Sequence, residues 1–178
     1  MIAQEFRFAS ARRRVKELIE EGYLGPLQLV VLRLLLGPRR TRRPTPFSAD
    51  RDIAAAFAGA ADGFVATLHL VDGGRATMIA STSVPFGPGT TIEIYGRDGT
   101  LATPQTGLNP PGHGTLLGAK IGEEGLAKIP ILERLEPFAD TRDDRLMPFR
   151  LLVREFVQGI NNEGKSPAPN FYGGLRCQ

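Results

Sequence analysis

The sequence predicts an α+β fold, built from a mostly antiparallel open sheet with helices packed on one face. Strand-like segments follow one another between residues 64 and 131 with short turns, which favours antiparallel pairing. Apolar residues at helical spacing occur on either side of this run, at residues 8–21 and 145–160. This order of elements is typical of helices layered on a sheet.

The N-terminal part predicts one helix followed by one buried strand. Residues 8–21 have an apolar and a charged helical face, with Ser10 as the expected N-cap and Gly22 as the expected stop. The almost continuous apolar run Leu27–Leu36 has the length and flanking turns of a buried strand. It includes Arg33 and is too short to span a bilayer.

The middle of the chain predicts a meander of strands. Alternating residues occur at 64–71 and 75–84, joined by the turn Asp72–Gly74. Further strands are expected at 90–95, 100–103, 115–121 and 126–131. The helix expected at residues 145–160 has an apolar stripe that needs a large packing surface.

The net charge of +3 comes from one part of the chain. Residues 1–43 hold ten basic and four acidic side chains, whereas the remainder is net acidic. A loop at residues 37–50 contains four arginines, at positions 39, 40, 42 and 43. This Arg39–Arg43 patch could bind phosphates, but a solvated loop is the default interpretation, and nucleic acid is not an expected partner.

The composition of 42% hydrophobic and 23% charged residues is that of a globular protein. Cys177 is the single cysteine, so an intrachain disulfide is excluded. Two histidines, His69 and His113, limit histidine-based catalysis and metal binding, and no metal site is expected. No export signal precedes the first arginines, which favours a cytoplasmic location.

Four segments carry a family resemblance. They are EFRFASARRRVKELIEEGYLGPLQLVVLRLLL (5–36), GTTIEIYGRDGTL (89–101), DDRLMPFRLLVREFVQGI (143–160) and PAPNFYGGLRCQ (167–178). In this order they resemble the C-terminal domain of the Gfo/Idh/MocA oxidoreductase family. Members of that family combine an N-terminal Rossmann domain, which binds NAD(P), with a C-terminal α+β domain that shapes the substrate site and forms subunit contacts. Their substrates are sugars, polyols and related small molecules.

The chain departs from the family pattern in three places. It has no strand–GxGxxG–helix unit and no Glu-Lys-Pro motif, so the resemblance implies a domain without its Rossmann partner. The family's glycine-rich helix with an Asp and a His is missing where residues 37–62 stand. The chain also ends where the family continues as a helix. The resemblance therefore implies one domain over residues 1–178, shortened at both ends and internally near 37–62.

Two residues are candidates for substrate binding. Arg7 matches a family position that faces the active-site cleft, with a surface residue as the alternative. His69 alternates with Thr67 and Val71 on one strand face, and a neutral, half-exposed histidine is its alternative. No catalytic residue and no cofactor-binding residue is assigned.

These observations predict the substrate-binding and oligomerisation half of an NAD(P)-dependent oxidoreductase. The chain is not expected to transfer hydride or bind NAD(P) on its own, so a separate Rossmann-domain chain would have to supply the cofactor. A homo-oligomer through the open sheet face is expected, and no membrane partner. The alternative is a non-catalytic, sheet-mediated interaction module. Anion or nucleic-acid binding by the arginine loop is a third and weaker hypothesis.

Overall fold

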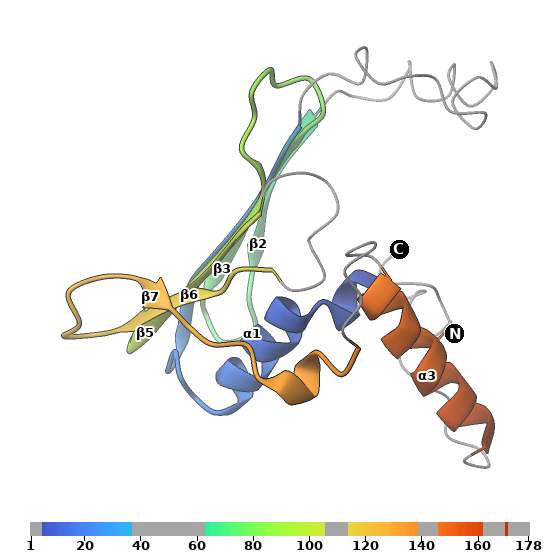
Figure 1. The fold of residues 1–178 in the computed structure, drawn as a ribbon. Coiled ribbons are helices and arrows are strands. Elements are labelled where there is room, and N and C mark those ends of the chain that lie inside the picture. Colours follow the sequence, from blue (N-terminus) through green and yellow to red (C-terminus); the bar gives the residue numbers. More distant parts are fainter. Residues whose placement is uncertain (1–4, 37–62, 106–113, 139–145, 162–169, 171–178) are drawn as a thin grey trace, which may run out of the picture.

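The computed structural model describes residues 5–36, 63–105, 114–138, 146–161 and 170, and the structural statements below concern these residues. They form a mixed, mostly antiparallel open sheet of seven strands with two α-helices, which confirms the predicted α+β class. Both helices lie on the same side of the sheet (Figure 1).

The sheet has the strand order β2-β3-β1-β4-β5-β6-β7. The strands are β1 (Leu27–Leu35), β2 (Gly63–His69), β3 (Arg75–Ser81), β4 (Gly89–Gly96), β5 (Gly99–Gln105), β6 (Leu117–Lys120) and β7 (Ala127–Lys128). β1 pairs in parallel with β3 and antiparallel with β4, and every other pair is antiparallel. The expected meander is therefore interrupted, because the first strand of the chain is inserted between β3 and β4.

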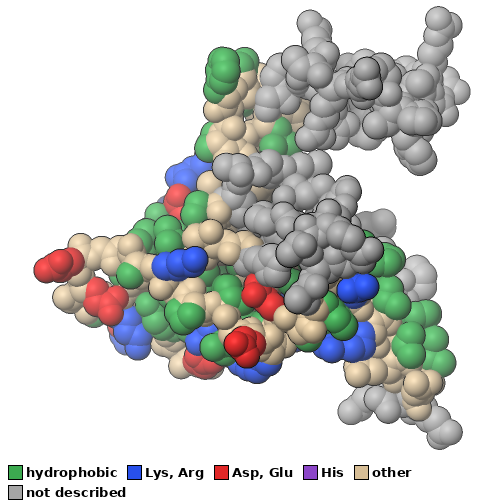
Figure 2. All heavy atoms as spheres, viewed as in Figure 1, with side chains coloured by type: hydrophobic (Ala, Val, Ile, Leu, Met, Phe, Trp, Pro, Cys, Tyr) green, Lys and Arg blue, Asp and Glu red, His purple; other side chains and the backbone are tan. Residues whose placement is uncertain are grey.

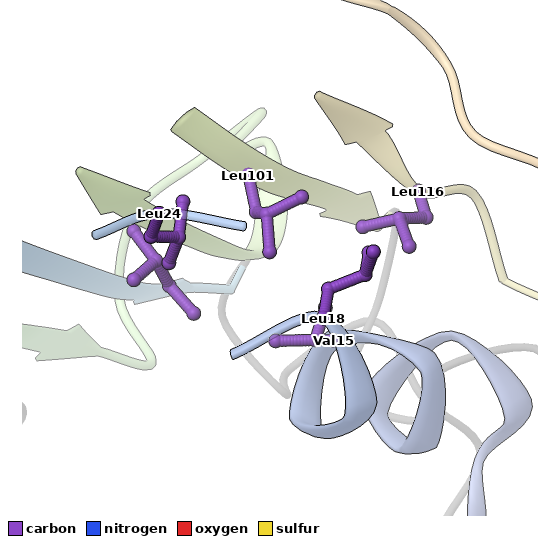
Figure 3. Close-up of a cluster of buried hydrophobic side chains, with 6 residues drawn as sticks. Val15, Leu18, Leu24, Leu101 and Leu116 are labelled. Carbon is purple, nitrogen blue, oxygen red and sulfur yellow. The ribbon is translucent and has the colours of Figure 1, made fainter. Parts of the chain in front are cut away.

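The main core lies between helix α1 (Ser10–Glu20) and one face of the sheet. Figure 3 shows Val15 and Leu18 of α1 pointing towards Leu24, Leu101 and Leu116. Alternation along the strands directs Ile94 of β4 and Leu101 of β5 to the same face, where both are buried. This packing fixes which face of the sheet is covered.

The ends of α1 confirm one predicted cap and correct the other. Gly22 follows the helix with a φ of +76°, and its N–H donates to the carbonyl of Ile19, as expected of a glycine stop. Ser10 is not the N-cap. The N-cap residue is Ala9, and the Ser10 hydroxyl donates instead to a carboxylate oxygen of Glu136 at 2.8 Å, a partner 126 residues away.

Within the described residues, the buried contacts of helix α3 (Leu146–Asn161) come from its N-terminal half. Met147, Leu151 and Leu152 are buried against Phe8 of the 3-10 helix η1 (Glu5–Phe8). The other apolar side chains remain exposed, and Figure 2 shows hydrophobic side chains gathered along this helix. They are Phe149, Val153, Phe156, Val157 and Ile160. The described residues thus cover only part of the predicted apolar stripe.

The core predicts that two substitutions of aliphatic residues by alanine differ greatly in their effect on the free energy of unfolding. Leu101→Ala removes a side chain that is 0% exposed, so the free energy of unfolding should fall by about 2–5 kcal/mol. Ile121→Ala, at a site 82% exposed, should change it by about 0.5 kcal/mol or less. Urea unfolding of both variants measures the difference, and equal losses would contradict this description of the core.

Candidate functional site

The sheet face opposite α1 carries a cluster of polar side chains. Strand alternation places Val30 and Ile94 on the helix side, so Val31, Arg33 and Glu93 lie on the other face. We call this face the open face, because no described helix packs on it. It is the one surface of the sheet where charged side chains stand in the middle of central strands.

Arg33 and Glu93 form an ion pair across β1 and β4. Arg33 Nη1 lies 2.6 Å from Glu93 Oε1, and the Tyr95 hydroxyl donates to Glu93 Oε2 at 3.0 Å. The side chains of Arg33 and Glu93 are 36% and 25% exposed, so the pair is half-buried. Both carboxylate oxygens of Glu93 are engaged, and the pair carries no net charge.

The electrostatic surroundings keep Tyr95 protonated. Burial raises the pKa of Tyr95, and the hydrogen bond to Glu93 together with the negative charge of Glu93 raises it further, while Arg33 opposes the shift. The tyrosine is therefore a fixed hydrogen-bond donor. With its acceptor oxygens occupied, Glu93 is poorly placed to act as a general base, and the cluster suits recognition of a surface better than proton transfer.

A shallow hollow of about 390 Å³ adjoins this cluster. It lies over the ends of β4 to β6 and includes Tyr95, Arg97 and Lys120. Both cations already have partners: Arg97 Nε pairs with Asp98 at 2.9 Å, and Lys120 Nζ stands 5.1 Å from the centre of the Tyr23 ring. The charge of Arg97 is therefore paired, whereas the ring contact leaves the positive charge of Lys120 in the hollow.

The structure does not bring the two sequence-predicted site residues together. Arg7 is exposed on η1, next to the part of the molecule where α3 packs. His69 is the last residue of the edge strand β2, and its side chain lies on the open face. Its neighbour on β3 is Arg75. Within the described ranges, no hydrogen bond or ion pair links Arg7 or His69 to the other or to the Arg33–Glu93 pair.

Several other predicted features fall outside the described residues. These are His113, the Arg39–Arg43 loop, the internal shortening near residues 37–62 and Cys177. In the part of the chain that the structure does describe, no group of three or more His, Cys, Asp or Glu side chains could hold a metal ion. No helix in that part is long and apolar enough to cross a bilayer.

The sequence contains a signal for this cluster in two isolated charges. Arg33 is the single charge within Leu27–Leu36, and Glu93 is the single charge within TTIEIY. Two isolated and opposite charges in apolar strands are costly to bury unless they pair. Their partnership depends on β1 lying beside β4, which chain order alone does not predict.

Comparison with known proteins relates the chain to oxidoreductases. No protein-family model matches it. An uncharacterised oxidoreductase of Synechocystis is 25% identical over 219 residues, an alignment that includes gaps and covers 98% of this chain and 59% of the relative. An NAD-binding oxidoreductase from Klebsiella pneumoniae shares the fold with a TM-score of 0.71 at 14% identity, over 98% of this chain and 60% of its own. Levoglucosan dehydrogenase, in complex with NADH and L-sorbose, has a TM-score of 0.71 at 17% identity, with 98% and 59% covered.

These matches correct the interpretation of the chain as a C-terminal domain without its Rossmann domain. The similar proteins are whole oxidoreductases of the Gfo/Idh/MocA type, and this chain spans about 59% of the length of the curated relative. The assignment to the C-terminal domain was wrong, because the matched proteins are whole oxidoreductases and the match does not show which half of them this chain represents.

The cluster predicts a specific change in tyrosine titration. Glu93→Gln removes the carboxylate charge beside Tyr95, so the pKa of Tyr95 should fall while remaining above the ordinary value because of burial. Phenolate absorbance against pH, compared with Tyr95→Phe to assign the transition, measures the shift.

A matched control uses the other described tyrosine. Burial and the charge of Glu123 raise the pKa of Tyr23, so Glu123→Gln should lower that pKa and leave the titration of Tyr95 in place. A Tyr95 transition that does not move in Glu93→Gln would show that the hydrogen bond is not formed in solution.

Proposed function

We propose that the chain functions as part of an NAD(P)-dependent oxidoreductase that acts on sugars, polyols or related small molecules. The observation that carries this proposal is the match of nearly the whole chain to whole oxidoreductases, in sequence and in fold. Levoglucosan dehydrogenase, whose structure contains NADH and L-sorbose, supports the sugar-like substrate class. The relation is to proteins longer than this chain, which spans about 59% of the curated relative.

The described residues do not fit a dinucleotide. A dinucleotide site places a glycine-rich turn between a parallel strand and the N-terminus of a helix. Helix α1 follows η1 instead, and the described glycines with positive φ, such as Gly73 of the β2–β3 hairpin, do not stand between a strand and a following helix. We therefore assign hydride transfer to an assembly in which a separate Rossmann-domain chain supplies NAD(P), and derive no step through the cofactor.

The proposed contributions of this chain are substrate contact and subunit contact. Arg7 and His69 remain proposed substrate-binding residues, and their separate exposed positions allow each to meet a different partner surface. The open face is the proposed contact between copies. Its half-buried Val31 and Ile79 provide apolar area, while the internally neutral Arg33–Glu93 pair avoids placing an unpaired charge in an interface.

A non-catalytic interaction module is the alternative function. The observation that favours it is the large exposed apolar surface of the described residues, which includes Phe156 and Ile160 of α3 as well as Phe64 and Val65 of β2. Such a module would use the same surfaces without a substrate. A cytoplasmic location remains a prediction under both functions.

The proposal predicts that the isolated chain does not bind the cofactor. Titration with NADH, followed by calorimetry and by nicotinamide fluorescence, should show no saturable binding at micromolar concentrations. Adding a Rossmann-domain chain from the same source should then generate binding if the oxidoreductase assembly is correct. Saturable micromolar binding of NADH by the chain alone would disprove the proposal that a separate chain supplies the cofactor. If no added Rossmann-domain chain generates NADH binding, the non-catalytic interaction module is favoured.

The open-face contact predicts that a charge placed there reduces self-association. Ile79→Lys puts an unpaired ammonium group on this face, so the dissociation constant of the oligomer should rise about tenfold or more. Sedimentation velocity measures the change. Ile19→Lys, on the outer surface of α1 and 37% exposed, is the control that should leave association unchanged. Equal dissociation constants for Ile79→Lys and Ile19→Lys would contradict the proposal that the open face is the contact between copies.

A further inference from the structure

Strand β2 forms one edge of the sheet, and its outer side has no neighbouring strand in the described chain. Between Gly63 and His69 it contains no Asp, Glu, Lys or Arg. Its apolar side chains are exposed on both faces: Phe64 is 52%, Val65 70% and Leu68 59% exposed. Natural edge strands are usually protected by charges, prolines or bulges, and β2 has none of these in its described residues.

The hairpin geometry shows which backbone groups of β2 face outward. The N–H of Leu70 donates to the carbonyl of Gly74 at 2.8 Å, so the backbone of Leu70 points towards β3. Because this direction alternates along an antiparallel strand, Leu68, Ala66 and Phe64 also bond β3. The N–H and C=O groups of the intervening residues Gly63, Val65, Thr67 and His69 therefore point away from the sheet.

We propose that β2 pairs antiparallel with β2 of a second copy of this chain, and so joins two sheets edge to edge. A two-fold axis at Ala66 places Val65 of one copy opposite Thr67 of the other, and Gly63 opposite His69. Every outward-facing N–H of one copy then meets an outward-facing carbonyl of the other copy. Phe64 lies opposite Leu68 on the helix-side face, where aromatic and aliphatic side chains pair favourably.

The strand is suited to a second copy because it is complementary to itself. The register centred on Ala66 uses all seven residues of β2, and the absence of charge means that no like charges face each other across the axis. The opposite edge of the sheet cannot extend the assembly in the same way. That edge is β7, which is two residues long and ends in Lys128. An isologous contact with one usable edge per chain joins two copies through this edge and no more.

This contact is distinct from the proposed open-face contact. Edge pairing depends on backbone hydrogen bonds of β2, whereas face packing depends on side chains in the middle of the sheet, such as Ile79. The two can therefore be separated by experiment, and neither requires the other.

The decisive variant is Thr67→Pro in the full-length chain. Proline removes the outward N–H and leaves the hydrogen bonds of Ala66 and Leu68 to β3, and an edge strand tolerates it when the lost N–H faces out. Two hydrogen bonds disappear per dimer, so the dissociation constant measured by sedimentation should rise about 30-fold. Thr67→Val keeps the N–H and the side-chain shape, and should dimerise like the unaltered chain.

Hydrogen exchange on the unaltered chain supplies a test that needs no substitution. The amides of Val65 and Thr67 should exchange more slowly as protein concentration rises, whereas that of Ala66, which bonds β3, should not respond to concentration. The same pattern should persist in Ile79→Lys. Edge pairing is overturned if, with Ile79→Lys present in both to remove the open-face contact, Thr67→Pro dimerises as tightly as Thr67→Val, or if the Val65 and Thr67 amides exchange at the same rate at all concentrations.

Discussion

The fold depends on the position of β1 between β3 and β4. Its backbone bonds a parallel neighbour on one side and an antiparallel neighbour on the other, so Val30 lies opposite both Ala76 and Ile94. Among the described elements, β1 is the only strand that connects the β2–β3 hairpin to the rest of the sheet. A shift of β1 by one residue would turn Arg33 towards the apolar core beneath α1. The Arg33–Glu93 pair therefore favours the same register of β1 as the burial of Val30 beneath α1.

The elements of this fold were predictable where their signals are local. The turn at Asp72–Gly74 and the glycine stop at Gly22 depend on positive φ, and both appear as expected. The place of β1 was not predictable, because its neighbours lie about 45 and 60 residues further along the chain and no local pattern records that distance. The cap at Ser10 failed for the same reason, since its partner Glu136 belongs to a distant segment.

The candidate site was likewise predictable only in the features that depend on local sequence. Single charges at Arg33 and Glu93 could be read from the sequence, but only the adjacency of β1 and β4 makes them one cluster. The four resembling segments likewise identified oxidoreductase relatives correctly. Their assignment to the C-terminal half was wrong, because short segments indicate individual elements and do not show which half of a whole protein the chain represents.

The two proposed contact surfaces differ in what they require from the fold. The open face needs side-chain complementarity, and its ion pair is already satisfied within one copy. The β2 edge needs a strand held in register, which β3 provides through seven paired residues. That hairpin joins the sheet through the β1–β3 parallel ladder, and parallel pairing is slightly less stable per residue than antiparallel pairing. A partner strand at β2 would therefore stabilise a hairpin that, among the described strands, only β1 holds to the rest of the sheet, and face packing near β4 would not supply this benefit.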